Sequence, residues 1–311
     1  MNRGIYLVAN RRSEREAANL VHSLRQAGCR WPIALIPFDD DLPTHPRLRA
    51  ETTLLDLKSF PREALELLGQ IAALWPKSRP GLFRRMLAWY GPFDEFIYSD
   101  NDIVALGDWT PYLDRLGVAD LLHADVEYTT GGIFAYKKPV VVVESFGPAA
   151  LDSVFTTGHF ASHKNPDITS IFSATIAWLR DHPGVAHEVD GSFLHLAVLV
   201  GSLRVTNLCQ PPDDWASPWA GDYRNALEVA QAARRGKLLQ LHYSGWIPDG
   251  YLAREEFLFS DLTDSERMRR LIGAALGRWS GLHYLNGKFK RGLLRRFEAA
   301  ERQRANKKRS P

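Results

Sequence analysis

Apolar runs alternate with helix-like segments in the first part of the chain. Residues 5–9 and 33–38 are almost wholly apolar, as expected of strands that are buried on both faces of a sheet. Residues 13–26 lie between them, carry apolar side chains at helical spacing and begin with Ser13, a favourable residue at a helix N-terminus. This strand, helix, strand order predicts an α/β protein with a mainly parallel sheet.

The same reading continues along the chain. The apolar run after Gly132 predicts another core strand, whereas the polar, histidine-containing residues 155–167 predict a loop. The pattern predicts further strands at residues 54–57, 95–98, 119–123, 203–208 and 238–241, and further helices at 62–74, 82–90, 168–180, 190–200, 268–279 and 289–301.

Two carboxylates directly follow the strand predicted at residues 95–98. Asp100 and Asp102 are separated by Asn101, so at a strand-to-turn junction both side chains can converge on one ion. Magnesium in proteins is usually held by one or two carboxylates together with substrate phosphates. The simpler interpretation of these residues alone is a polar turn, because Asp, Asn and Ser are common in turns.

Two other places are candidates for contact with a ligand. Ligands of a parallel sheet bind outside the carboxyl ends of its strands, so Asn10, after the first strand, is a candidate for contacting a nucleotide. An asparagine that only starts a helix fits this position equally well. Gly131 and Gly132 allow a positive φ and a close approach of the backbone to a ligand.

The acidic motif and its surroundings carry a resemblance to a known family. Two arginines, Arg84 and Arg85, are followed by a Pro-containing turn, a strand, the string Asp100-Asn101-Asp102 and then residues 103–108, IVALGD. This order resembles the DxD region of GT-A-type glycosyltransferases and is most similar to their family 8-like group. The resemblance implies a GT-A-like, mixed and mainly parallel sheet flanked by helices. It also implies that the acidic motif holds Mn²⁺ or Mg²⁺ and a nucleoside diphosphate sugar.

The resemblance also implies roles for residues far from the acidic motif. Arg84 would reach the donor, and Asp190 would lie beside the anomeric carbon of the sugar. His242 would be the third protein ligand of the metal, and Gly245 matches the glycine that follows it in the family motif. Simpler interpretations make His242 a core histidine and Asp190 a cap of the helix at 190–200.

Three departures from the family pattern affect the expected chemistry. Pro248 stands where the family has a lysine, so another cation must neutralise the leaving diphosphate, and Arg84, Lys137 and Lys288 are the candidates. Thr129 and Gly191 stand where the family has an asparagine and a glutamine near the sugar. The sequence therefore does not predict the identity of the sugar.

Composition adds a view of the chain's surroundings. With 311 residues, 45% hydrophobic and 24% charged, it is typical of a globular protein. It lacks a run of apolar residues long enough to cross a membrane, and its start lacks the features of a secretory signal. Two cysteines cannot form a disulfide framework. We therefore expect a cytoplasmic protein.

Positive charge gathers near the C-terminus. The expected division is a GT-A-like domain at residues 1–260 and a helical, basic extension at 261–311. The helix at 289–301 is amphipathic and basic, which suits a peripheral position on an anionic surface such as the inner face of a membrane. A docked helix with a solvated basic face is the simpler alternative.

These features predict a metal-dependent glycosyltransferase. It would move a sugar from a nucleoside diphosphate sugar, with UDP favoured, to a glycan, lipid or protein acceptor, and the resemblance implies retention of the anomeric configuration. One alternative is a glycosyltransferase-like protein that binds nucleotide or glycan without turnover. Another is a sugar nucleotidyltransferase, although residues 10–13 form no Gly-rich phosphate loop. No segment resembles a nucleic-acid-binding module, so nucleic acid is not an expected partner.

Overall fold

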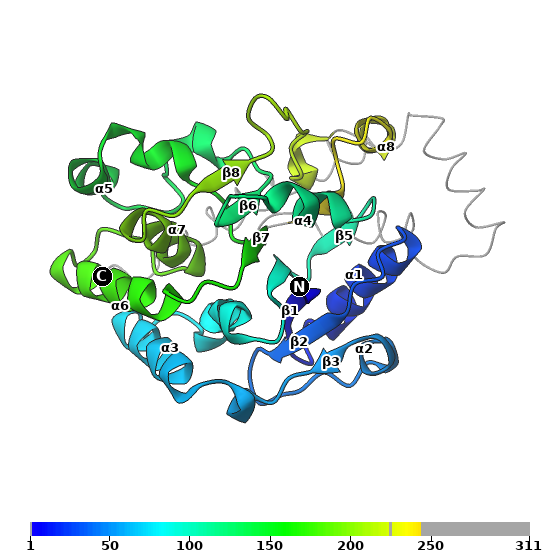
Figure 1. Cartoon of the computed structure of the whole chain (residues 1–311), viewed down its shortest axis with the longest axis horizontal. Helices are drawn as coiled ribbons and strands as arrows, with labels where there is room; N and C mark the ends of the chain where they lie inside the picture. Colours follow the sequence, from blue (N-terminus) through cyan, green and yellow to red (C-terminus); the bar gives the residue numbers. More distant parts are fainter. Residues whose placement is uncertain (1, 224–225, 244–311) are drawn as a thin grey trace, which may run out of the picture.

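The computed structural model describes residues 2–223 and 226–243. In this part of the chain, seven strands form one mixed sheet with the order β3-β2-β1-β4-β7-β6-β8 (Figure 1). Most neighbouring pairs are parallel, which confirms the expected mixed, mainly parallel α/β architecture. The strands are β1 (Arg3–Ala9), β2 (Ile33–Pro37), β3 (Thr53–Leu54), β4 (Glu95–Ser99), β6 (Leu121–His123), β7 (His159–His163) and β8 (Val205–Asn207).

The order of the first strands creates a place for a ligand. From β1 the sheet grows in one direction through β2 and β3, and in the other direction through the parallel strand β4. The helices that leave β1 and β2 therefore do not fill the space above the carboxyl ends of β1 and β4. This reversal of strand order is where open α/β sheets bind their ligands.

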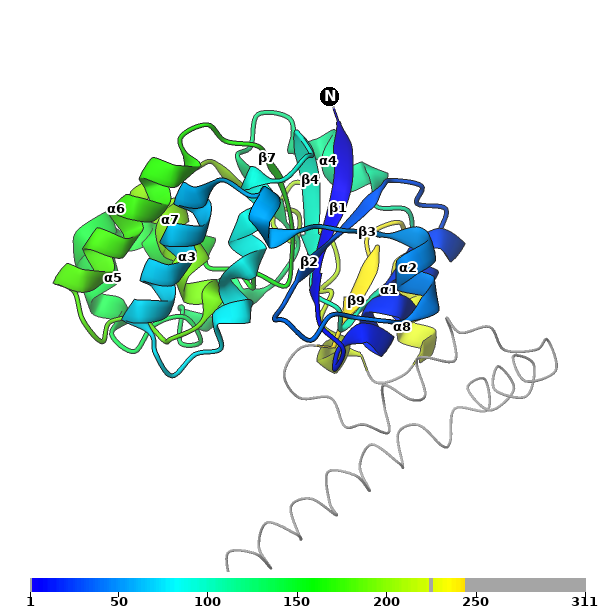
Figure 2. The same cartoon turned by 90° about the horizontal axis from the view of Figure 1, so that it is seen from below.

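Helices cover both faces of the sheet. Successive strand residues point to opposite faces, so each face carries apolar side chains that pack against helices. Tyr6 and Val8 of β1 pack into one buried cluster, whereas Ile5 and Leu7 pack into another. Figure 2 shows α3, α5, α6 and α7 on one side of the sheet and α1, α2 and α8 on the other. The helices are α1 (Glu14–Gln26), α2 (Pro46–Glu51), α3 (Arg62–Leu74), α4 (Thr110–Leu116), α5 (Pro139–Phe146), α6 (Ile168–Asp181), α7 (Asp190–Val200) and α8 (Ala226–Arg234), with 3₁₀ segments at Leu57–Ser59, Pro80–Tyr90, Glu127–Thr130, Pro148–Ser153 and Ala220–Asp222.

The prediction of a loop at residues 155–167 is wrong for the central residues, which form a strand. His159–His163 forms β7, which lies between β4 and β6 and runs antiparallel to both. Its polar residues misled the sequence interpretation, but they have partners inside the protein. Ser162 Oγ accepts a hydrogen bond from Trp89 Nε1, and the His159 ring packs edge-on against Trp109.

The prediction of a core strand after Gly132 is also wrong, because the described chain forms no strand there. Gly131 and Gly132 both adopt positive φ, 64° and 75°, so the chain turns instead of extending. The turn leaves Ile133 and Phe134 exposed, at 59% and 65% of their surface. The run is thus exposed at Ile133 and Phe134, and only Ala135 and Tyr136 join the core.

A second, small sheet completes the described fold. Strand β5 (Ile103–Ala105) directly follows the acidic motif and pairs antiparallel with β9 (Gln240–His242). Ile103 lies opposite His242 in this register. The pairing brings the last described strand alongside the residues that follow Asp102.

Several sequence predictions lie outside the described residues. They include Gly245, Lys288, the helices expected at 268–279 and 289–301, and the basic membrane-facing extension. The proposed boundary at residue 260 also stays a prediction. Within the described ranges, no helix combines the length and the apolar character needed to cross a bilayer.

The aromatic cluster between the sheet and α6 provides a test of the core. Trp89 is buried, stacks on Phe160 and meets Phe96 and Phe172 edge-on. Trp89→Ala would leave a cavity and remove the hydrogen bond to Ser162, so we expect a loss of about 3–5 kcal/mol in the free energy of unfolding, measured by urea denaturation.

Val118→Ala is the control for that substitution, because Val118 is 79% exposed. Its free energy of unfolding should stay within about 0.5 kcal/mol of the unmodified protein. Equal losses in the two variants would contradict this description of the core.

Candidate functional site

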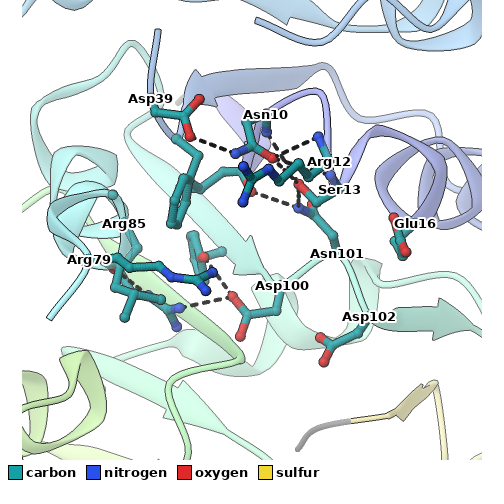
Figure 3. A pocket seen from close by; sticks show the side chains of 15 residues that line it. Asn10, Arg12, Ser13, Glu16, Asp39, Arg79, Arg85, Asp100, Asn101 and Asp102 are labelled. Atoms are coloured by element: carbon teal, nitrogen blue, oxygen red, sulfur yellow. Dashed lines mark hydrogen bonds and ion pairs between the residues drawn. The ribbon is translucent and has the colours of Figure 1, made fainter. Parts of the chain in front are cut away.

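A cavity of about 560 Å³ opens at the carboxyl ends of β1 and β4. We call it the β1–β4 pocket. Its lining includes Asn10 after β1, residues 100–102 after β4, and the side chains of Arg79 and Arg85. Figure 3 shows the two arginines across the pocket from Asn10, with Asp100 facing the arginines. The pocket thus occupies the position that the reversal of strand order predicts for a ligand.

Two asparagines hold the turns that frame this pocket. Asn10 Oδ1 accepts hydrogen bonds from the backbone N–H groups of Arg12 and Ser13, at 3.1 and 3.2 Å. Asn101 Nδ2 donates to the carbonyl of Val8 at 2.7 Å, which ties the acidic motif to the end of β1. Asn10 therefore stabilises the turn that leads into α1 and also lines the pocket, and its contact with a nucleotide stays a prediction. Asn101 fixes the turn that carries the two carboxylates.

The structure brings Asp100, Asp102 and His242 together. One ligand atom from each, a carboxylate oxygen or a ring nitrogen, lies within 4.8 Å of the others. Nε2 of His242 is buried, lies 3.3 Å from Asp102 Oδ1 and makes no hydrogen bond with the described residues. A buried nitrogen without a hydrogen bond, facing two carboxylates, suits a divalent cation such as Mn²⁺ or Mg²⁺, which takes oxygen and imidazole ligands.

Backbone contacts fix the position of His242. Its N–H donates to the carbonyl of Pro218 at 2.7 Å, and the N–H of Tyr243 donates to the carbonyl of Asp102 at 2.9 Å. The imidazole lies against Gly158, where a Cβ atom would clash with the ring. The N–H of Asp100 donates to the carbonyl of the same Gly158 at 2.6 Å. Gly158 therefore positions both the histidine and the first carboxylate.

Arg85 organises the other side of the cluster. Its guanidinium is buried and forms ion pairs with Asp100 at 3.1 Å and with Asp190 at 2.7 Å. It also donates to the carbonyl of Thr157 at 2.6 Å and lies over the Tyr98 ring, 4.8 Å from its centroid. Figure 3 shows it reaching toward Asp100. The Arg85 guanidinium thus links the acidic motif to Asp190, the first residue of α7.

The positions of the two adjacent arginines differ. Arg84 donates to the carbonyl of Pro37 at 2.7 Å and does not line the pocket, whereas Arg85 does. Arg85, not Arg84, therefore lines the β1–β4 pocket, and contact of Arg84 with a donor stays a prediction. Consecutive residues of a helical segment point in different directions, and spacing along the sequence does not show which of them faces a pocket.

Of the remaining predicted residues, Asp190 joins the cluster, whereas Gly131, Gly132 and Lys137 do not line the β1–β4 pocket. Asp190 joins the cluster through Arg85 and Thr157, and it is the first residue of α7 without making a capping hydrogen bond. Gly131 and Gly132 do not line the β1–β4 pocket and instead form the turn before Phe134. Lys137, a candidate for neutralising a diphosphate, lies 3.8 Å from Glu188.

Burial and neighbouring charges set the protonation of the cluster. Burial raises the pKa of Asp100 to about 6; Arg85 opposes this rise, and Asp102 adds to it. Burial also raises the pKa of Asp102, but His242 lowers this pKa by more than burial raises it. The net pKa of Asp102 therefore lies below the usual value. For His242, burial lowers the pKa, and the two carboxylates outweigh burial and raise it. The pKa of Asp100 and the pKa of His242 are therefore both raised, so protons compete with a cation for these two groups.

Comparison with known proteins then shows what this fold is. No family model and no curated protein matches the sequence. Solved structures do match. The bifunctional glycosyltransferase WbbM superposes with a TM-score of 0.57 at 14% identity, over 86% of this chain and 51% of that one. The chain has a GT-A glycosyltransferase fold.

Two further solved structures support the assignment of the fold. The galactosyltransferase LgtC, in complex with donor and acceptor sugar analogues, gives a TM-score of 0.53 at 14% identity, over 85% of this chain and 99% of that one. Mouse xyloside xylosyltransferase 1 gives 0.50 at 11% identity, over 78% and 98%. This chain spans about half the length of WbbM. The expected GT-A-like fold is confirmed, and membership of the family 8-like group stays a prediction.

The Arg85 network yields a test against its neighbour. Arg85→Ala would leave Asp100 and Asp190 as buried carboxylates without their counter-charge, so we expect a loss of about 3–5 kcal/mol in the free energy of unfolding. Arg84→Ala removes one hydrogen bond to Pro37 and should cost about 1 kcal/mol. Urea denaturation at pH 7.5 measures both values. A larger loss of unfolding free energy for Arg84→Ala than for Arg85→Ala would contradict the assignment of Arg85 as the buried partner of Asp100 and Asp190.

The protonation of the cluster predicts how cation binding depends on pH. Ionising Asp100 above its raised pKa costs stability, and the stability that protonated His242 contributes is lost as pH rises through its raised pKa. A cation needs both groups deprotonated, so it replaces those protons. We expect the apparent affinity for Mn²⁺ to be about tenfold or more lower at pH 5.5 than at pH 7.5, measured by isothermal titration calorimetry.

The control for the pH prediction removes one carboxylate ligand. Asp102→Asn should abolish Mn²⁺ binding at both pH values. Equal affinities of the unmodified protein at pH 5.5 and 7.5 would be inconsistent with a site made of Asp100, Asp102 and His242.

Proposed function

We propose that this protein is a metal-dependent glycosyltransferase that transfers a sugar from a nucleoside diphosphate sugar, with UDP favoured, to a glycan, lipid or protein acceptor. The observation that carries the proposal is the cluster of Asp100, Asp102 and His242 at the edge of the β1–β4 pocket. The cluster offers ligands for a divalent cation where an open α/β sheet binds a nucleotide. The GT-A fold supports the same conclusion.

The charges around the pocket suit a diphosphate. Arg12, Arg79 and Arg85 line it, and Arg85 is committed to Asp100 and Asp190. The guanidinium groups of Arg12 and Arg79 make no hydrogen bond or ion pair with other described residues, and both residues are exposed. We assign to these two arginines the charge that the family lysine would supply, because arginine pairs well with phosphate oxygens.

The chemistry follows from these assignments. The oxygen of an acceptor hydroxyl bonds to the anomeric carbon of the donor, and the bond from that carbon to the diphosphate breaks, with its electron pair leaving on the diphosphate. The hydroxyl proton passes to a diphosphate oxygen. A divalent cation bound by Asp100, Asp102 and His242 would offset the charge that develops on the leaving group. Retention of the anomeric configuration follows only from the family resemblance.

A thermal-shift series tests the donor site. We expect UDP with Mn²⁺ to raise the melting temperature more than either alone, and more than GDP with Mn²⁺, because cation and diphosphate share a site. Asp102→Asn should remove the effect of Mn²⁺. Release of free sugar from a panel of UDP-sugars then distinguishes an enzyme from a protein that only binds nucleotide.

The arginine assignment has a matched control. The double variant Arg12→Ala, Arg79→Ala should weaken UDP binding about tenfold or more and leave uridine binding unchanged, because only the diphosphate contacts are lost. Arg15→Ala removes an exposed arginine that does not line the pocket and should change neither affinity. Equal losses for UDP and uridine in the double variant would show that these arginines do not bind the diphosphate.

A further inference from the structure

A second cavity, of about 620 Å³, includes His242 in its lining. We call it the Trp219 pocket. Its walls come from the turns after β6, from the segment before β7, and from residues 217–222. The β1–β4 pocket contains Asp100 and Asp102, so the two pockets meet at the Asp100, Asp102 and His242 cluster from different sides. A ligand in the Trp219 pocket would therefore lie next to the bond that the proposed reaction breaks.

Aromatic and hydroxyl groups make up much of the Trp219 pocket. The side chains of Trp219 and Phe134 are exposed, at 41% and 65% of their surface, and both line the cavity. Threonine and serine side chains supply hydroxyl groups beside them. A sugar ring presents an apolar C–H face and a rim of hydroxyl groups, and such a lining matches both.

The position of Trp219 is fixed relative to the cluster. Its backbone forms a β-bridge with His242, and the N–H of His242 donates to Pro218 beside it. The indole lies against Gly221, where a Cβ atom would clash with the ring. The same contacts therefore hold His242 and the aromatic wall, which gives a bound sugar a defined place beside the cluster.

The two pockets differ in their cationic side chains. Three arginines line the β1–β4 pocket beside its carboxylates, Glu16, Asp39, Asp100 and Asp102. Asp125, Glu127 and Asp222 line the Trp219 pocket, without a lysine or arginine among its described lining residues. Asp125 accepts hydrogen bonds from the N–H groups of Glu127 and Thr156, which hold its carboxylate at the pocket wall. Burial, and then Asp125, raises the pKa of Glu127. A further negative charge would therefore be repelled from this pocket.

We propose that the Trp219 pocket binds the acceptor as a sugar without negative charge, stacked on Trp219, and that its three carboxylates exclude uronic acids and sugar phosphates. The proposal rests on the proposed function and adds the chemical class of the acceptor. The charge contrast directs the anionic donor to one side of the cluster and the uncharged acceptor to the other. Carboxylates can accept hydrogen bonds from the acceptor's hydroxyl groups.

Saturation-transfer NMR on the full chain tests this proposal. The neutral probes are the methyl glycosides of glucose, galactose, mannose and N-acetylglucosamine, and the anionic probes are methyl glucuronide and glucose 6-phosphate. Each is titrated with UDP and Mg²⁺ present and again without them. We expect at least one neutral glycoside to bind at least fivefold more tightly than either anionic probe.

Variants connect this preference to named residues. Trp219→Ala should weaken binding of the neutral glycoside at least tenfold with UDP affinity unchanged, and Trp219→Phe should restore most of it. Asp222 is exposed, so Asp222→Lys should fold normally and raise the affinity for methyl glucuronide several-fold. Asp152→Lys is the matched control, because Asp152 is exposed and lines neither pocket.

The outcomes distinguish the two proposals. Equal binding of neutral and anionic probes, no binding of any neutral glycoside, or a preference that Asp222→Lys leaves unchanged would overturn the assignment of the Trp219 pocket. If the protein binds neutral glycosides but not UDP with Mg²⁺, the acceptor assignment stands and the donor site of the proposed function fails.

Discussion

The candidate site depends on one buried guanidinium. Arg85 pairs with two carboxylates that come from different parts of the chain, Asp100 after β4 and Asp190 at the start of α7. Burying two carboxylates this close together would be unfavourable without a cation between them. Arg85 therefore joins the end of β4, where Asp100 lines the pocket, to the first residue of α7, and the site and the fold share one interaction.

The arrangement around this interaction separates charges in space. Arginines line the β1–β4 pocket beside its carboxylates, whereas the described lining of the Trp219 pocket has carboxylates and no arginine or lysine. The cluster of Asp100, Asp102 and His242 has members in both linings. The proposed transfer would use such a division, because its donor carries a diphosphate and its acceptor needs only a hydroxyl group. The fold provides it by using opposite sides of the acidic motif: the turns after β1 and β4 on one side, and the turns after β6 and before α8 on the other.

The sequence predicted the parts of this protein that follow from local chemistry. Buried parallel strands read as apolar runs, so β1, β2 and β4 were predictable, and the two carboxylates at the end of β4 stood out. The strand β7 was missed because its polar side chains find partners only in the folded protein. Which of Arg84 and Arg85 lines the pocket was not predictable for a related reason, since it depends on which way a 3₁₀ segment faces. The approach of His242 to Asp102 was expected from resemblance and depends on a pairing between distant strands.

That pairing has a consequence for how the protein is made. The chain leaves the ribosome from its N-terminus, so the strands that carry Asp100 and Asp102 are synthesised long before β9. Until β9 docks on β5, the two acids lack their nitrogen partner, because His242 enters the cluster through this register. Closing so long a loop is among the slower steps of folding. A nascent or truncated chain that ends before Gln240 would therefore retain both acids and lack His242, so the proposed three-ligand cation site would require a chain made at least as far as His242, with β9 docked on β5.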